Sequence, residues 1–294
     1  MNIKLILGPM RIPFLILSPV CVLLGVATAV RAGSQINVFH LILIFVGAIL
    51  SHISVNALNE YSDFKSGLDF DTKPTPFSGG SKTLPANPEK AFVGLVIGVT
   101  AVILSGIIDV LFIYIKGFWF LPVVILKFIL IITYTNYITK SSLFCLIAPG
   151  LGFGPLMVMG AHFVISGSYS WASFLASLVP FFLVNDLLLL NQFPDVEADK
   201  KVGRKHLLIS GGKEISTKVY SVFLVCAFMP IIIGYYLGFF PLKCFLGLIP
   251  CLLVIPTIIG VHRHNNDTSR LIPYMGINVV INILTPLLFA IGLF

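Results

Sequence analysis

Acidic and carboxamide side chains gather where two apolar segments of the chain end. They are Asn59, Asp63 and Asp69 after the first segment, and Asn191, Asp195 and Asp199 after the second. Magnesium prefers oxygen ligands and usually binds through one or two carboxylates together with the phosphates of a substrate. Two such groups that face each other would hold a diphosphate between metal ions, which neutralise the charge that develops as diphosphate leaves. The residue types therefore predict a magnesium and diphosphate site.

The spacing of the first group predicts how it is presented. Asn59 and Asp63 are four positions apart, so they share one face of a helix that continues through them. Asp69 lies beyond Gly67, and we expect a turn at this glycine to fold the carboxylate back toward the same place.

The second group has the same spacing. Asn191, Asp195 and Asp199 follow one another at intervals of four, which predicts one polar stripe along a helix. Pro194 is expected to kink that helix near the membrane surface, because proline removes a helical hydrogen bond.

Basic residues in the same two loops would add direct contacts to phosphate oxygens. They are Lys65, Lys73, Lys82, Lys200, Lys201, Arg204 and Lys205. The alternative is that these cations only set membrane topology. Acidic residues are not needed for topology, so the paired acidic groups favour a joint functional role. The adjacent Gly79 and Gly80 in the first loop would form an anion-binding nest.

The composition indicates what positions these motifs. The chain has 294 residues, of which 57% are hydrophobic and 11% charged, whereas a soluble domain carries about 25% charged residues. Apolar runs of the length that crosses a bilayer predict an all-α membrane protein with about nine transmembrane helices. These runs are 12–30, 37–58, 90–114, 118–135, 143–166, 171–191, 216–239, 242–261 and 271–293.

The distribution of lysine and arginine predicts the orientation. Fifteen of them lie at the N-terminus and in the even-numbered loops, and three lie in the odd-numbered loops. This bias places the N-terminus and both motif loops in the cytoplasm.

The two motifs also suggest an internal repeat. Asn59 and Asp63 recur as Asn191 and Asp195 at an offset of 132 residues. We therefore expect one membrane domain over residues 1–294, with halves of four helices at about 10–140 and 141–265 and a last helix at about 270–294.

Together the motifs resemble those of the UbiA superfamily of intramembrane prenyltransferases. The segment from Asn59 to Asp69 is similar to the family pattern Asn-Asp-Tyr-x-Asp-x-x-x-Gly-x-Asp, and a Gly-Gly loop follows it. The segment from Asn191 to Arg204 is similar to Asn-x-x-x-Asp-x-Glu-x-Asp-x-x-x-Gly-Lys/Arg. The resemblance covers essentially the whole chain. Within the superfamily, the motifs look most similar to those of the 1,4-dihydroxy-2-naphthoate prenyltransferases of menaquinone synthesis.

The resemblance implies nine helices around a central cavity, with the diphosphate at the cytoplasmic end and a side opening for a lipid tail. It implies Mg2+ as cofactor, transfer of a prenyl group from a prenyl diphosphate to an aromatic quinone precursor, and a prokaryotic plasma membrane. We expect neither a nucleic acid nor an obligate protein partner.

The resemblance also implies roles for individual residues. Asn59, Asp63, Asp195 and Asp199 would be catalytic and hold metal and diphosphate, and Asp69 and Asn191 would join them as metal ligands. The expected contacts to diphosphate are Arg11, Lys65, Lys73, Lys140, Lys201 and Lys205.

Three departures from the family pattern concern the first motif and the acceptor. Glu60 stands where the family usually has Asp. Tyr134 and Tyr137 precede Lys140 by six and three positions, where the wider superfamily often has Tyr-x-x-x-Lys. Asn136 and Tyr137 replace a Gly-Pro that is typical of the dihydroxynaphthoate branch.

Other polar residues lie in apolar runs, where ionisable groups are costly and often functional. We predict Asn56, Tyr134, His162 and Asp186 as residues of the acceptor cavity. For Asp186 and His162 the alternative is a structural hydrogen bond. Lys127 is expected to pair with Asp109 or Asp186, or to extend from a helix end toward the membrane surface.

Two other functions stay open at this point. The acceptor could be 4-hydroxybenzoate, homogentisate, a glycerol-phosphate lipid, a porphyrin-type ring or another quinone head group. A transporter or channel would also carry repeated halves and intramembrane charges. The dense charge clusters lie at one face and the outer loops carry no acid, which argues against a path through the bilayer.

Overall fold

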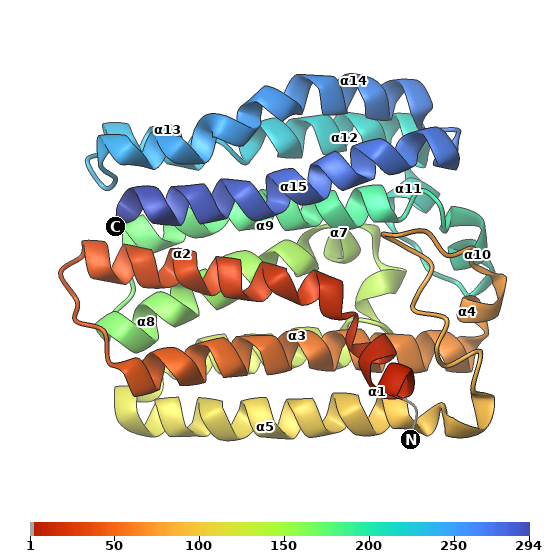
Figure 1. Cartoon of the computed structure of the whole chain (residues 1–294), viewed down its shortest axis with the longest axis horizontal. Helices are drawn as coiled ribbons and strands as arrows, with labels where there is room; N and C mark the ends of the chain where they lie inside the picture. The colour runs from red at the N-terminus through yellow and green to blue at the C-terminus, as the bar shows by residue number, and fades with distance from the viewer. Residues whose placement is uncertain (1–2) are drawn as a thin grey trace.

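The computed structural model describes residues 3–294 and shows a bundle of roughly parallel and antiparallel helices (Figure 1). Eight helical segments are long and apolar enough to cross a membrane. They are Ile12–Arg31, Val38–Ser66, Pro88–Lys116, Ser142–Ser166, Trp171–Asn191, Gly212–Tyr236, Leu242–His264 and Thr268–Leu293. The ninth apolar run forms a shorter helix, Phe118–Thr133. The predicted all-α, polytopic architecture is confirmed, with the run at 118–135 shorter than expected.

The longer elements carry the following labels and bounds. They are α2 (Leu17–Arg31), α3 (Val38–Ser66), α5 (Phe92–Lys116), α6 (Leu121–Thr133), α7 (Ser142–Leu151), η5 (Gly152–Met159), α8 (Gly160–Ser166), α9 (Trp171–Asn191), α12 (Gly212–Cys226), α13 (Met229–Tyr236), η6 (Leu242–Leu253), α14 (Val254–His264) and α15 (Thr268–Leu293).

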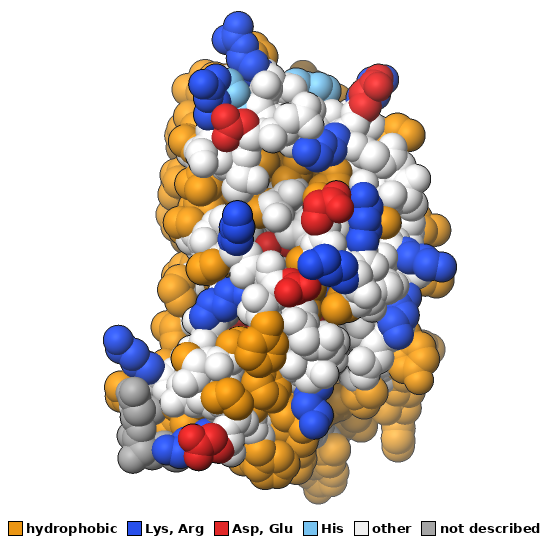
Figure 2. Space-filling model, turned by 90° about the vertical axis from the view of Figure 1, so that its right-hand side faces the viewer, with side chains coloured by type: hydrophobic (Ala, Val, Ile, Leu, Met, Phe, Trp, Pro, Cys, Tyr) orange, Lys and Arg blue, Asp and Glu red, His pale blue; other side chains and the backbone are white. Residues whose placement is uncertain are grey.

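Short helices gather at one end of the bundle, on the right in Figure 1. They include α1 (Ile3–Met10), η1 (Ile12–Ile16), α4 (Leu68–Asp71), η2 (Pro88–Lys90), η4 (Ile138–Lys140), α10 (Val196–Lys201) and α11 (Leu207–Ser210). Figure 2 shows this end from outside, with many of the charged side chains on it. Both motif loops therefore lie at the same end of the molecule.

The outer faces of the helices are apolar. On α5, the side chains of Ile103, Ile107 and Val110 are 57–66% exposed and follow helical spacing along one face. Exposure of such a stripe to water would be unfavourable, whereas the hydrocarbon of a bilayer solvates it.

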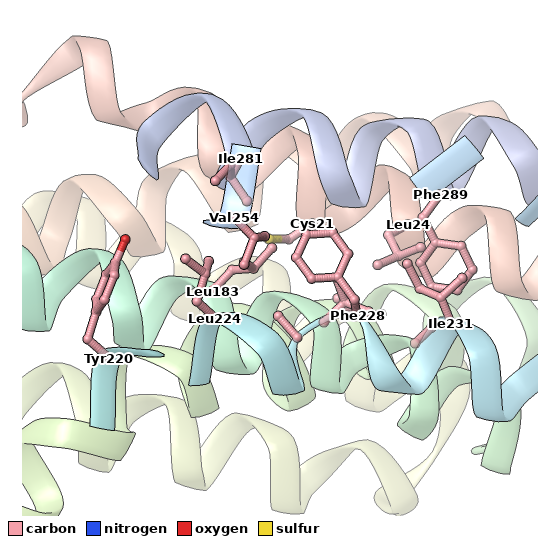
Figure 3. Packing of buried hydrophobic residues seen from close by; sticks show 14 of the residues in the cluster. Cys21, Leu24, Leu183, Tyr220, Leu224, Phe228, Ile231, Val254, Ile281 and Phe289 are labelled. Carbon is pink, nitrogen blue, oxygen red and sulfur yellow. The ribbon is translucent and has the colours of Figure 1, made fainter. Parts of the chain in front are cut away.

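The larger packed core lies between α2, α9, α12, α14 and α15. Figure 3 shows Leu183, Leu224, Phe228, Val254 and Ile281 packed together there. A second cluster joins α2, α3, α5, α6 and α8. The division into two related four-helix halves stays a prediction.

Candidate active site

A cavity of about 350 Å³ runs through the bundle from the charged end. Its walls are mostly apolar. The polar side chains at its charged end include Arg11, Asn59, Asp63, Asp69, Asn191, Asp195, Asp199 and Arg204. The structure thus brings every predicted catalytic and metal-ligating residue to one end of one cavity.

The last turns of α3 present the first motif. Asn59 donates a hydrogen bond from Nδ2 to Oδ2 of Asp63 at 2.8 Å, so the two side chains share a face as predicted. Gly67 then ends the helix in the left-handed region with φ of 82°, which glycine adopts without steric cost. Helix α4 follows at once and returns Asp69 to the cavity.

The second motif is divided between two helices. The structure corrects the predicted kinked helix, because α9 ends at Asn191 and α10 begins at Val196. Pro194 lies in the turn between them, where its missing N–H breaks no helical hydrogen bond. Asn191 and Asp195 still line the cavity.

The glycine loop of the first motif contacts the second motif. The backbone N–H of Gly79 donates to Oδ2 of Asp195 at 3.0 Å, so it is engaged by a carboxylate here. Gly79 and Gly80 both have positive φ. A Cβ on Gly80 would lie 2.6 Å from Oδ1 of Asp69, so only glycine fits this close approach.

Arg204 connects the two motifs directly. Its guanidinium forms ion pairs with Asp63 of the first motif and with Asp199 of the second. Oδ2 of Asp199 also lies 3.0 Å from Nε2 of His206. Asp63 and Asp199 are 5% and 2% exposed, so this cation compensates two carboxylates that have little access to water.

Arg11 is held in place by Glu60, the residue that departs from the family pattern. Glu60 is fully buried and accepts from Nε of Arg11 at 2.7 Å and from the backbone N–H of Ser81 at 2.8 Å. Its second oxygen accepts from Oγ of Ser81 at 2.9 Å. Glu60 therefore positions the cavity-lining Arg11 and fixes the glycine loop to α3.

Two carboxyls at this end of the cavity are costly to ionise. Burial raises the pKa of Asp69 to about 7, and the charges of Glu60 and Asp63 raise it further. Burial also raises the pKa of Asp195 to about 6, with a further contribution from Asp199. Such groups favour a bound cation, because its charge would stabilise the ionised carboxylates.

The donor atoms fit magnesium. Asp69 Oδ2, Asn191 Oδ1 and Asp195 Oδ1 are buried and accept no hydrogen bond within the described residues. All three residues line the cavity, and all three atoms are hard oxygen donors of the kind that magnesium prefers. No three His, Cys, Asp or Glu side chains of residues 3–294 form a complete metal site. Magnesium commonly completes its shell with water and substrate phosphates.

The lysines predicted to contact diphosphate lie outside the cavity lining, so their contact with a bound diphosphate stays a prediction. Five of the six predicted contacts are exposed and do not line the cavity: Lys65, Lys73, Lys140, Lys201 and Lys205. The sixth, Arg11, does line it. Lys201 instead pairs with the exposed Asp71 at 2.8 Å. A long side chain at a loop position is free to extend into water, so its place in the sequence does not fix its direction.

Two of the four residues predicted for the acceptor cavity line it, and two do not. Asn56 and Tyr134 line the cavity, whereas His162 and Asp186 do not. Nδ1 of His162 lies 2.9 Å from Oγ1 of Thr28, so it makes the structural hydrogen bond that was the alternative. Asp186 is fully buried among the helices and has no hydrogen-bond partner within the described residues.

Lys127 pairs with Asp109, one of its two predicted partners, and both side chains line the cavity.

Two histidines that line the cavity were not predicted from the sequence. His52 lines it from α3, and its Nδ1 lies 2.9 Å from Oγ of Ser18. Its position one helical turn before Asn56 was the available signal. His206 lines the cavity beside Asp199, but its placement depends on the fold of a loop.

Residues 18–280 match the UbiA prenyltransferase family. A curated relative, the 1,4-dihydroxy-2-naphthoate octaprenyltransferase of Bacillus subtilis (strain 168), is 28% identical over an alignment of 199 residues, and the match covers 62% of this chain. The match spans only 60% of that relative's length.

Two solved structures share the fold over nearly the whole chain. One, described as digeranylgeranylglyceryl phosphate synthase, is 19% identical with a TM-score of 0.68, and the likeness covers 99% of this chain and 98% of that chain. The other, a UbiA homolog from Archaeoglobus fulgidus bound to GPP and Mg2+, is 16% identical with a TM-score of 0.61 and covers 94% and 98%. The chain is a polytopic membrane protein that belongs to the UbiA prenyltransferase family.

Proposed function

We propose that this protein transfers a prenyl group from a prenyl diphosphate to an aromatic quinone precursor and releases diphosphate. The observation that carries the proposal is the meeting of two Asp motifs at the charged end of one long apolar cavity. The charged end suits a diphosphate and the apolar walls suit its tail. The likeness to the Archaeoglobus homolog, which is bound to GPP and Mg2+, supports a prenyl diphosphate and Mg2+ as the ligands.

Asp69, Asn191 and Asp195 would hold Mg2+ with oxygens that are unpartnered now, and Asp63 and Asp199 would join them. Bound there with diphosphate, Mg2+ would neutralise the charge of the leaving group. Arg11 would contact a phosphate oxygen directly, because Glu60 holds it at the cavity wall.

The reaction would proceed by loss of diphosphate from C1 of the prenyl group. The carbon–oxygen bond breaks and its electron pair leaves with diphosphate, which gives an allylic cation. An electron-rich ring carbon of the acceptor then forms the new bond to C1, and the ring loses a proton. The apolar wall around this place would exclude water, which would otherwise capture the cation.

The acceptor in this proposal is an aromatic such as 1,4-dihydroxy-2-naphthoate, supported by the Bacillus relative. The second candidate is a glycerol-phosphate lipid, which the likeness to digeranylgeranylglyceryl phosphate synthase favours. Asn56 and Tyr134, which line the cavity near the motifs, are the residues we assign to acceptor contact.

We also propose that the charged end faces the cytoplasm, as the distribution of lysine and arginine indicates. Helix α1, the first described element, lies at that end, and the C-terminus lies at the opposite end (Figure 1). This is the arrangement that nine membrane crossings would produce.

The test is incubation of purified protein with Mg2+, a labelled prenyl diphosphate and a panel of acceptors. The panel contains 1,4-dihydroxy-2-naphthoate, 4-hydroxybenzoate, homogentisate and a glycerol-phosphate lipid, with product mass as the readout. We expect an adduct with the naphthoate that disappears on chelation of the metal. An adduct with the lipid alone would favour the second candidate, and no adduct with any acceptor would overturn the proposal.

A further inference from the structure

A second group of polar side chains is buried away from the cavity, in the core that α9 forms with α12 and α15. Asp186 of α9, Tyr220 of α12 and Asn278 of α15 are each 0% exposed, and none of them lines the cavity. Both carboxylate oxygens of Asp186, the Tyr220 hydroxyl and the side-chain oxygen of Asn278 have no hydrogen-bond partner within the described residues. Buried polar atoms are normally partnered, so these four oxygens point to a ligand.

The packing of the core places the three side chains at one depth. Leu183 of α9, Leu224 of α12 and Ile281 of α15 pack together (Figure 3). Helix α9 runs toward the charged end of the bundle, whereas α12 and α15 run away from it (Figure 1). The polar side chains follow three residues later on α9, and precede by four residues on α12 and by three on α15. These spacings keep each one on the buried face of its helix, one turn nearer the charged end.

Electrostatic proximity shows that the carboxyl of Asp186 faces α12. It lies within electrostatic range of the Tyr220 phenol and of the Cys226 thiol, which are six residues apart on α12. Figure 3 shows the hydroxyl of Tyr220 pointing from α12 into the core.

Helix α15 supplies a second carboxamide. Asn282 lies one turn after Asn278 and is 2% exposed. Its Nδ2 donates to the backbone oxygen of Asn278 at 3.0 Å, which turns the side chain back toward that residue. Its Oδ1 has no hydrogen-bond partner within the described residues.

The charge of Asp186 decides which kind of ligand fits. No lysine or arginine of residues 3–294 is paired with it. An isolated carboxylate in an apolar core is far more costly than an unpartnered amide, so the ligand must supply positive charge. One positive charge neutralises one carboxylate, whereas Mg2+ would leave an excess charge and gives up its water reluctantly. A proton would neutralise the carboxyl but could serve only one of the other oxygens.

We propose that these side chains bind one monovalent alkali-metal cation between α9, α12 and α15. The ligands are Asp186, Tyr220, Asn278 and Asn282. Because none of them lines the cavity, the ion takes no part in prenyl transfer, and the inference does not rest on the proposed function. It would stabilise α9, which presents Asn191 to the cavity five residues after Asp186.

The test is thermal unfolding of the purified protein in detergent with EDTA, while NaCl or KCl replaces choline chloride at constant ionic strength. We expect a saturable rise in Tm of about 5 °C with at least one of the two alkali ions. Equilibrium dialysis with radiolabelled Na+ or Rb+ should give one bound ion per chain. Equal Tm values in the three salts would overturn the proposal. A rise on acidification in choline chloride, with none from either ion, would assign the site to a proton and also overturn it.

Variants separate this site from the proposed magnesium site. Asp186→Asn removes the charge with little change of shape and should abolish the ion-dependent rise in Tm. Tyr220→Phe removes one ligand oxygen and should weaken ion binding about tenfold. Asp71→Asn, at an exposed position, should keep the full rise. Asp195→Asn should also keep it, because that carboxylate lines the cavity instead.

If Asp186→Asn fails to fold, Tyr220→Phe and Asn278→Leu test the same ligands without removing a charge. A rise of wild-type size in Asp186→Asn, or in both of these replacements, would overturn the proposal. A rise that is lost in Asp195→Asn but kept in Asp186→Asn would place the ion in the cavity, which contradicts a separate site.

Discussion

Arg204 forms a buried ion pair with Asp63, a residue 141 positions earlier in the chain. The same guanidinium contacts Asp199 at 2.9 Å. One cation thus joins the two motifs that the proposed magnesium site would use. We infer that it holds the carboxylates together before metal and substrate bind.

Replacing Arg204 with Gln should destabilise the metal-free protein. Loss of one partner from a buried ion pair leaves uncompensated charge and typically costs about 3–5 kcal/mol. Thermal unfolding in detergent should show a lower Tm without Mg2+, and Mg2+ should raise the Tm of the variant more than that of the wild type. The matched control is Lys201→Gln, which removes an exposed ion pair and should hardly change Tm. Equal Tm values for wild type and Arg204→Gln would contradict the bridging role.

Asp63→Asn and Asp195→Asn test the two motifs separately. Each change removes a negative charge from the proposed metal site while keeping the side-chain shape. Transfer should fall by about 10²–10³-fold or more in either variant, as when an electrostatic partner of a developing charge is lost. Product formation measured across a Mg2+ titration checks this.

The control for these substitutions is Asp71→Asn, because Asp71 is exposed and lies outside the cavity lining. It should retain near-normal turnover. Near-normal turnover of Asp63→Asn or Asp195→Asn at low Mg2+ would be incompatible with a metal site built from both motifs.

The raised carboxyl pKa values predict how pH acts on the metal-free protein. Burial raises the pKa of Asp195 to about 6 and that of Asp69 to about 7, whereas both are near 3.9 in an unfolded chain. Between about pH 4 and pH 7 the folded protein therefore binds more protons than the unfolded one. Stability from these groups falls as pH rises through that window.

Magnesium should reverse this trend, because it binds the deprotonated carboxylates. The rise in Tm on adding Mg2+ should be larger at pH 8 than at pH 5.5. In the double variant Asp69→Asn, Asp195→Asn the difference between the two pH values should shrink. A Mg2+ effect that is the same at both pH values in the wild type would contradict this prediction.

Much of the fold follows from local properties of the sequence. Long apolar runs predict the helices, and the four-residue spacing of Asn59 and Asp63 predicts their shared face, which the hydrogen bond between them confirms. The turn after Gly67 that returns Asp69 to the cavity follows from the glycine. These features depend on residues that are neighbours along the chain.

The features that local properties do not predict depend on tertiary structure. Nothing near Arg204 in the sequence indicates that it contacts Asp63 rather than solvent, whereas the similar Lys201 and Lys205 point outward. In the sequence, nothing distinguishes His52 and Phe112 from the other residues of the apolar helices that contain them. Only the register of α3 against α5 places them along one cavity.

The ion pair between Asp109 and Lys127 should stabilise the bundle only as a pair. Both side chains are largely shielded, with 12% and 18% exposure. Lys127→Met would leave the Asp109 carboxylate unpaired beside apolar walls, which should cost about 3–5 kcal/mol. The double variant Asp109→Leu, Lys127→Met should recover most of that loss, because an apolar pair of similar size often replaces a buried ion pair without penalty. Unfolding measurements on the wild type, on Lys127→Met, on Asp109→Leu and on the double variant give the coupling energy between the two side chains. Lys90→Met, at an exposed position in η2, is the control for loss of a lysine charge. If the double variant were as unstable as Lys127→Met, α5 and α6 would need these charges for more than their mutual neutralisation.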